Sequence, residues 1–218
     1  MWGMMSWLPV YNSWVVMVGI VSLFLWKLWG VFFFLGALIF SAYFLVWEVF
    51  FPHLSRYAMA FWLFIVSEVA IFGSLLLTVL WNDDGGEGAL SDSLELPFLG
   101  CFLLLTSSLT ATVYHHCFGL PYSWVFLLIS IFLGFGFVCL QLWEFFDCEC
   151  DVLYCTYFGA AFCTVGLHFS HVVAGVGAMT VLLVSGWDTN HFYASVVVWY
   201  WHSVDYVWLW VYLLIYYV

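Results

Sequence analysis

Seven long apolar segments follow one another along the 218-residue chain, and each is long enough to cross a lipid bilayer as a helix. Hydrophobic residues make up 67% of the sequence and charged residues only 7%, which leaves too little polar surface to cover a water-soluble globule. Long continuous apolar runs favour helices over a β-barrel. We therefore predict an all-α integral membrane protein with one membrane domain, residues 1–218, whose spans are residues 7–29, 30–51, 57–81, 98–118, 121–143, 156–186 and 192–217.

The charge of the chain is unbalanced, because Lys27 and Arg56 stand against 13 acidic residues. Two cations cannot neutralise a phosphate backbone, so a nucleic-acid role is excluded. Seven spans put the termini on opposite membrane faces, and the loops after the third and fifth spans then share the C-terminal face. Those loops predict an acidic surface that attracts a basic soluble partner, with simple solvation as the alternative. Their nine carboxylates are Asp83, Asp84, Glu87, Asp92, Glu95, Glu144, Asp147, Glu149 and Asp151.

The N-terminal residues and the cysteines do not indicate a processing signal or a disulfide-bonded fold. The N-terminal residues have neither the positive start of a secretory signal nor the Arg- and Ser-rich pattern of a transit peptide, so we expect no cleavable segment. The seven cysteines are scattered and do not indicate a disulfide framework. Cys148, Cys150 and Cys155 cluster in a polar loop, but their spacing does not match a zinc site.

Glu68 is the least explicable residue if nothing functional happens in the membrane. It lies about 11 residues into the third span, which at 1.5 Å per residue is about halfway across the hydrocarbon. A neutral carboxylic acid is its expected form there. Two interpretations stay open: an acid hydrogen-bonded to a neighbouring helix, or a group that moves protons or holds a polar lipid or another subunit.

His168 and His171 are three residues apart in the sixth span, which places both rings on one side of a helix. A metal or haem site would need further ligands, so hydrogen bonds across helices are the expected role. The opposite side carries small residues at four-residue spacing, which predicts a close-packing stripe and a central place for this span. The stripe consists of Gly166, Ser170, Ala174 and Ala178.

Polar residues also mark two other spans. His115 and His116 close the fourth span, where their rings are expected to satisfy the last helix carbonyls. His202 and Asp205 are three residues apart inside the last span, and an ionisable pair in hydrocarbon predicts contact with a protein neighbour or a polar cavity.

These features, taken in order, resemble subunit III of the haem-copper cytochrome c oxidases. The similarity extends from about residue 54 to the end, and before that it rests on the number and length of the spans. The matching segments are Arg56–Met59 with Phe64–Glu68, Tyr114–His116, Gln141 with Glu144, Gly166–Val172, and Trp199–Asp205, which is the strongest single match. Ser195 departs from the family pattern, which usually has a glutamate before Trp-Tyr-Trp-His, and the loops after the second and third spans are short.

The resemblance implies a fold and a set of partners. The first two helices stand apart from a bundle of five and form a cleft that holds phospholipids beside the catalytic subunit. The resemblance implies that this chain carries no redox metal and that the haems and copper belong to subunits I and II. By this resemblance Glu68 corresponds to the intramembrane glutamate of the family, and cytochrome c is expected to dock near the acidic face.

The leading hypothesis is a non-redox core subunit of cytochrome c oxidase that stabilises the catalytic subunit, holds phospholipid and supports proton uptake. The alternatives are a bis-histidine membrane cytochrome that uses His168 or His171, and an independent proton channel that uses Glu68, His202 and Asp205. We expect a multi-pass protein of the mitochondrial inner membrane with its N-terminus in the matrix and its C-terminus in the intermembrane space. The composition suggests a mitochondrially encoded gene.

Overall fold

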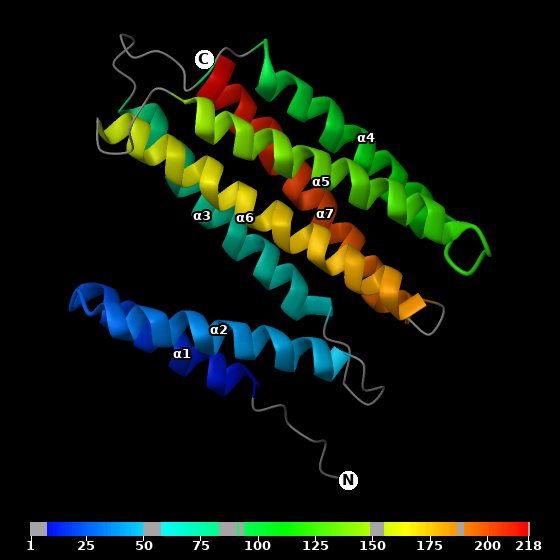
Figure 1. The fold of residues 1–218 in the computed structure, drawn as a ribbon, viewed down its shortest axis with the longest axis horizontal. Coiled ribbons are helices and arrows are strands. Elements are labelled where there is room, and N and C mark those ends of the chain that lie inside the picture. Colours follow the sequence, from blue (N-terminus) through cyan, green and yellow to red (C-terminus); the bar gives the residue numbers. More distant parts are fainter. Residues whose placement is uncertain are drawn as a thin grey trace. The chain divides into compact units, whose positions relative to one another are not determined.

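The computed structural model describes residues 8–49, 58–82, 91, 94–148, 155–186 and 190–217. In these segments the chain forms seven α-helices and one terminal π-helix, which confirms the predicted all-α class (Figure 1). They are α1 (Leu8–Phe24), α2 (Leu28–Val49), α3 (Ala58–Trp81), α4 (Leu96–His116), α5 (Ser123–Asp147), α6 (Thr156–Ser185), α7 (His191–Val211) and η2 (Tyr212–Tyr217).

The helices belong to two compact units, Met1–Arg56 and Tyr57–Val218. Four helices of the second unit, α3 to α6, are long and apolar enough to cross a membrane, judged by length and composition among the described residues. Two shorter apolar helices, Val10–Ser22 and Leu28–Phe44, lie in the first unit. The single membrane domain expected from the sequence stays a prediction.

The first unit is a hairpin of α1 and α2. A tight turn separates the helices at Trp26, whose φ of 51° lies in the left-handed region, so α1 ends at Phe24 rather than at the expected residue 29. A side chain at Gly30 would collide with Ser22, so glycine lets the start of α2 approach the end of α1. Across the hairpin, the Tyr11 hydroxyl donates a hydrogen bond to the carbonyl oxygen of Ala37 at 3.2 Å.

The second unit is a five-helix bundle in which α6 packs against α3, α5 and α7, and α4 packs against α5 and α7. Its centre is Trp201 of α7, which is fully buried. A Cβ atom on Gly134 of α5 or on Gly175 of α6 would lie within 3.0 Å of this indole, so both glycines are needed for the close approach. The Trp201 Nε1–H donates to Ser107 Oγ of α4 at 3.0 Å, which joins the indole to a fourth helix.

The predicted small-residue stripe on α6 does not make this contact. Ser170 and Ala174 are exposed, and no atom lies within 4 Å of a Cβ built on Gly166. The stripe was predicted from four-residue spacing alone, whereas close approach to another helix depends on where the partner places its largest side chain. Here that side chain is Trp201, and it packs against Gly175 rather than against a residue of the stripe. Any role of the stripe outside the bundle stays a prediction.

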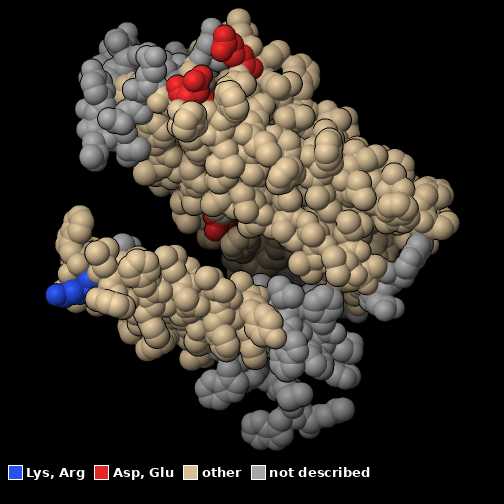
Figure 2. Space-filling view, viewed as in Figure 1, with Lys and Arg blue, Asp and Glu red and all other residues tan. Residues whose placement is uncertain are grey.

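The described acidic residues at the bundle's end follow the expected arrangement of loops. Figure 2 shows acidic side chains at the end of the second unit where α4 begins, after Glu95, and where α5 ends, at Asp147. The remaining loop carboxylates lie outside the described residues: Asp83, Asp84, Glu87, Asp92, Glu149 and Asp151. Glu144, expected in a loop, instead belongs to the last turn of α5, because the helix continues to Asp147 with Glu144 turned inward and 4% exposed.

Candidate functional site

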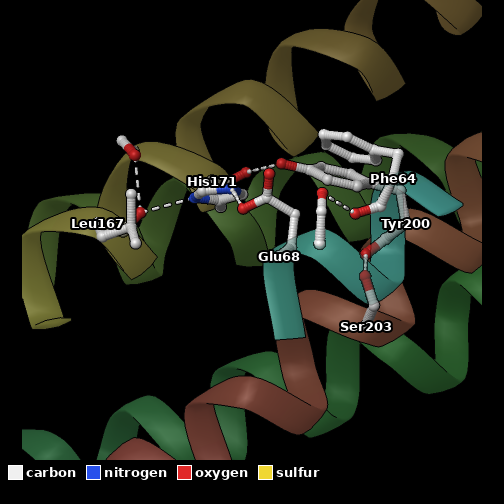
Figure 3. Close-up of polar contacts among 8 residues, drawn as sticks. Phe64, Glu68, Leu167, His171, Tyr200 and Ser203 are labelled. Atoms are coloured by element: carbon white, nitrogen blue, oxygen red, sulfur yellow. Dashed lines mark hydrogen bonds and ion pairs between the residues drawn. The ribbon is translucent and has the colours of Figure 1, made fainter. Parts of the chain in front are cut away.

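Glu68 of α3 and His171 of α6 meet in the membrane-spanning part of the second unit. Glu68 Oε2 lies 2.9 Å from His171 Nε2, and the two side chains are 21% and 16% exposed. Figure 3 shows the Glu68 carboxyl pointing at the imidazole, with Tyr200 of α7 beside both. The Tyr200 hydroxyl donates to the His171 carbonyl oxygen at 3.3 Å, so three helices contribute to the site.

The contacts of His171 fix how protons are arranged in this pair. Nδ1 lies 2.8 Å from the Leu167 carbonyl oxygen, which can only accept, so Nδ1 carries a hydrogen. In a neutral ring Nε2 then accepts a hydrogen bond from a Glu68 carboxylic acid. In a charged ring Nε2 donates to a Glu68 carboxylate. In both forms the pair holds one proton between Nε2 and Oε2.

Aromatic rings and a cavity surround the pair. Phe72 packs edge-on against His171 with ring centroids 5.5 Å apart, and Phe64 stacks on Tyr200 at 6.2 Å. A cavity of about 20 Å³, close to the size of one water molecule, is lined by Glu68, His171 and further residues of α3, α6 and α7.

A larger groove, defined here as the α3–α7 groove, adjoins this cavity. Its volume is about 550 Å³, and Ile65, Val69 and Phe72 line both the groove and the smaller cavity. Its walls are mainly apolar and aromatic, and they include Trp62, Trp199 and Trp210 together with the polar side chains of His202 and Ser203.

His168 lines the same small cavity as His171, but its ring makes different contacts. It is fully buried and directs Nε2 to the Val204 carbonyl oxygen of α7 at 3.2 Å, whereas His171 faces α3. Its ring lies 5.0 Å from Trp208 and 5.7 Å from Phe137. Nδ1 of His168 has no hydrogen-bond partner in the described part of the chain. Among the described residues, no three His, Cys, Asp or Glu side chains are grouped to hold a metal ion.

The predicted pair on the last span lies against α4. His202 Nδ1 is 2.6 Å from Ser108 Oγ, and its Nε2 is 3.3 Å from Thr112 Oγ1. Asp205 is 3% exposed, and neither carboxyl oxygen has a hydrogen-bond partner among the described residues. Sequence reasoning missed Ser108 and Thr112. Their spacing with His115, at i, i+4 and i+7, could have revealed a polar face on the fourth span.

The helix-end residues make specific side-chain contacts. His115 Nε2 lies 2.9 Å from Ser195 Oγ of α7, rather than bonding the last carbonyls of its own helix as expected. His116 is exposed, with its ring 6.0 Å from that of His115. Ser195, which the sequence singled out, thus has a side-chain partner on α4. At the other end of the unit, Glu144 accepts from Gln141 Nε2 at 2.7 Å and from Ser91 Oγ at 2.8 Å.

Comparison with known proteins gives a consistent result. The family described as Cytochrome c oxidase subunit III matches residues 16–218, which include every site residue above. The chain is similar to cytochrome c oxidase subunit 3 of Pisaster ochraceus, with 32% identity over 182 residues that cover 74% of this chain and 68% of the relative. Cytochrome c oxidase subunit 3 of Bacillus subtilis is 32% identical over 178 residues, covering 72% of this chain and 84% of the relative.

Proposed function

Because the chain belongs to the cytochrome c oxidase subunit III family, we propose that it is a non-redox core subunit that stabilises the catalytic subunit, holds structural phospholipid and supports proton uptake. Membership makes the chain a membrane-embedded part of an oxidoreductase complex. The three finer roles are inferences from this chain's own residues and from the family resemblance.

The observation that carries the proposal is the contact between Glu68 and His171. A 2.9 Å contact between α3 and α6 holds two helices together where water provides no hydrophobic drive for association. The pair is partly exposed beside the small cavity, so its shared proton can be reached from outside the bundle. The contact between two helices and the partial exposure together support a role for the Glu68–His171 pair both in stabilising the subunit and in proton uptake.

The α3–α7 groove supports the lipid role. Its volume of about 550 Å³ and its apolar, aromatic walls suit an acyl chain. Trp199 and Trp210 lie 11 residues apart on α7, which corresponds to about 16 Å at 1.5 Å per residue. Such a length accommodates an acyl chain that extends through about half of the hydrocarbon layer. The resemblance also implies a lipid cleft beside the first two helices.

The proposal extends to partners and location. Subunits I and II, which would hold the haems and copper, are the proposed neighbours, and cytochrome c would approach the acidic end marked by Glu95 and Asp147. The proposed location is the mitochondrial inner membrane, with the N-terminus in the matrix and the C-terminus in the intermembrane space. The contacts of His171 agree with a non-redox role, because both of its ring nitrogens already have partners.

The decisive experiment separates assembly from proton uptake. We would resolve solubilised membranes on a native gel, probe for this chain, and stain the gel for cytochrome c oxidation. We expect the chain to comigrate with the activity. We would then measure proton uptake by purified oxidase that carries Glu68→Gln, with Ser67→Ala as the neighbouring control, since Ser67 bonds only to its own helix at Phe64 among the contacts seen.

Each outcome bears on a different part of the proposal. Migration of the chain apart from the activity would contradict the role as a core subunit. Unchanged proton uptake in Glu68→Gln would remove the proton role and leave the stabilising role. Proton flux through liposomes that contain this chain alone would instead favour the independent channel, and a haem spectrum of the isolated chain would favour the membrane cytochrome.

A further inference from the structure

We propose that Asp205, Ser108 and His202 form a second proton-holding site in the seam between α4 and α7, where the Ser108 hydroxyl passes a proton between the carboxyl group and the imidazole. The seam is distinct from the Glu68–His171 contact, which joins α3 to α6. The inference extends the proposed proton role to a second site, and it holds even if Glu68 proves to have a structural role alone.

Two polar helix faces meet along this seam. On α4, Ser108, Thr112 and His115 follow the i, i+4, i+7 spacing of one helix face. On α7, Ser195, His202 and Asp205 likewise lie within one face, at spacings of seven and three residues. Three contacts already join the faces: His115 with Ser195 at 2.9 Å, Thr112 with His202 at 3.3 Å, and Ser108 with His202 at 2.6 Å.

The hydrogen-bond donors can be assigned from these contacts. Thr112 Oγ1 donates to the Ser108 carbonyl oxygen at 3.0 Å, so toward His202 it must accept. Nε2 of His202 therefore carries a hydrogen, and Nδ1 of the neutral ring accepts from the Ser108 hydroxyl at 2.6 Å. The oxygen of Ser108 then keeps a lone pair for a donor on its other side.

Asp205 supplies the missing donor. The carboxyl group is 3% exposed and lies next to the Ser108 hydroxyl of α4, although neither of its oxygens meets the geometry of a hydrogen bond to a described residue. Buried polar groups in proteins are nearly always satisfied by protein or by ordered water. A hydrogen bond from the protonated carboxyl group to Ser108 Oγ would satisfy the acid and complete a chain of hydrogen bonds from Asp205 to His202.

The transfer step is balanced without any other reactant. The Asp205 acid gives its proton to Ser108 Oγ as Ser108 gives its hydroxyl proton to His202 Nδ1. The products are a carboxylate and an imidazolium, and the reverse steps restore the neutral pair. Because a buried charge pair is costly in hydrocarbon, the neutral acid and neutral ring form the resting state.

Other titratable groups face the seam and define its two ends. His115 of α4 and His191 of α7, whose rings are 5.2 Å apart, lie toward the edge of the bundle, and His191 is exposed. At the inner end, the Cys101 thiol of α4 and the His168 ring of α6 both lie close to Trp208. The site can therefore exchange protons toward the exposed His191 end, and toward the α3–α7 groove, which His202 also lines.

Infrared spectroscopy of the purified oxidase tests the site directly. We expect the wild-type complex to show a carbonyl stretch of a protonated carboxylic acid that disappears in Asp205→Asn. After transfer to D₂O, this band should shift about tenfold more slowly in Ser108→Ala than in the wild type, the factor that corresponds to removal of one hydrogen bond from the exchange path. Ser170→Ala, whose hydroxyl bonds its own helix at Leu167, is the matched control.

The outcomes separate this inference from the proposed function. An acid band that is unchanged in Asp205→Asn would overturn the inference, and so would exchange in Ser108→Ala that is as fast as in Ser170→Ala. If Asp205→Asn does not assemble, Ser108→Ala still provides the test because it keeps the carboxyl group. Glu68→Gln removes a different acid, so loss of proton uptake in that variant together with a normal Ser108→Ala would leave the proposed function standing and remove the seam site.

Discussion

The second unit pairs an acidic residue with a histidine twice, and the two pairs are built differently. Glu68 and His171 touch directly at 2.9 Å, come from different helices, and are partly exposed. Asp205 and His202 lie on the same helix, Ser108 of α4 bonds to His202, and the carboxyl is almost fully buried. A direct contact between helices resists their separation, whereas a contact through a hydroxyl leaves room for a proton to move. We therefore expect the Glu68–His171 pair to contribute more to the stability of the bundle than the Asp205–His202 pair.

Both pairs depend on the position of α7, so the largest expected effect comes from displacing that helix. Gly175→Leu would place a side chain where Trp201 atoms lie 2.7 Å from a bare Cβ, and overpacking of this kind costs about 1–3 kcal/mol or more. We expect loss of the subunit from oxidase complexes on native gels. Ala174→Leu, one residue away and exposed, is the control and should assemble normally. Equal loss in both variants would mean that α6 is covered on its Ala174 side.

The next largest effect should come from removing the carboxyl group of the direct pair. Glu68→Ala leaves His171 Nε2 without its partner in a largely buried place, at a cost of about 1–3 kcal/mol. We expect a lower thermal midpoint for dissociation of this subunit from the purified complex. Glu68→Ala, His171→Ala and the double variant form a mutant cycle. If the double variant is destabilised by the sum of the two single effects, the residues do not interact and the comparison fails.

Much of this architecture could be predicted from the sequence, because the seven apolar runs determine the helices almost unaided. The Glu68 and Asp205 positions were also recognisable, since a carboxylate in hydrocarbon needs an explanation. The sequence could not show which residue each polar side chain contacts on the neighbouring helices. His168 and His171 share a helix face in the sequence pattern, yet one meets a carbonyl of α7 and the other a carboxyl of α3. That division depends on how three helices pack together.

The packing contacts were also beyond sequence reasoning, for a related reason. Regular spacing made Ser170 and Ala174 look like the contact surface, but the surface is chosen by the shape of Trp201 on another helix. Ser108 was overlooked because a serine in an apolar run is common and its importance comes from His202, 94 residues away. The role of a polar residue on one helix therefore depends on which side chains the opposite helix places against it.

A smaller effect is expected at the indirect pair. Asp205→Leu replaces a carboxyl group that has no hydrogen-bond partner in the described chain, so it gives up no protein hydrogen bond and gains apolar burial. Replacing buried polar groups by apolar ones of similar volume is often nearly neutral, and we expect a change below about 1.5 kcal/mol in the stability of the complex. The thermal midpoint should stay close to that of the wild type while proton exchange at the seam is lost. A destabilisation as large as that of Glu68→Ala would show that Asp205 holds helices together.

The smallest effect on assembly should come from Glu68→Gln, and it distinguishes the two proton arrangements of the direct pair. Because His171 Nδ1 carries a hydrogen, a neutral ring offers Nε2 as an acceptor, and the amide of glutamine can donate to it as the carboxylic acid does. We expect the subunit to remain in the complex with a stability change below about 0.5 kcal/mol, in the range of an ordinary tolerated substitution. If the pair were instead an imidazolium with a carboxylate, glutamine would remove a charge-assisted bond and the loss would approach that of Glu68→Ala. Measuring both variants by the same thermal dissociation therefore locates the proton, since the acid form predicts well-separated midpoints and the ion pair predicts similar ones.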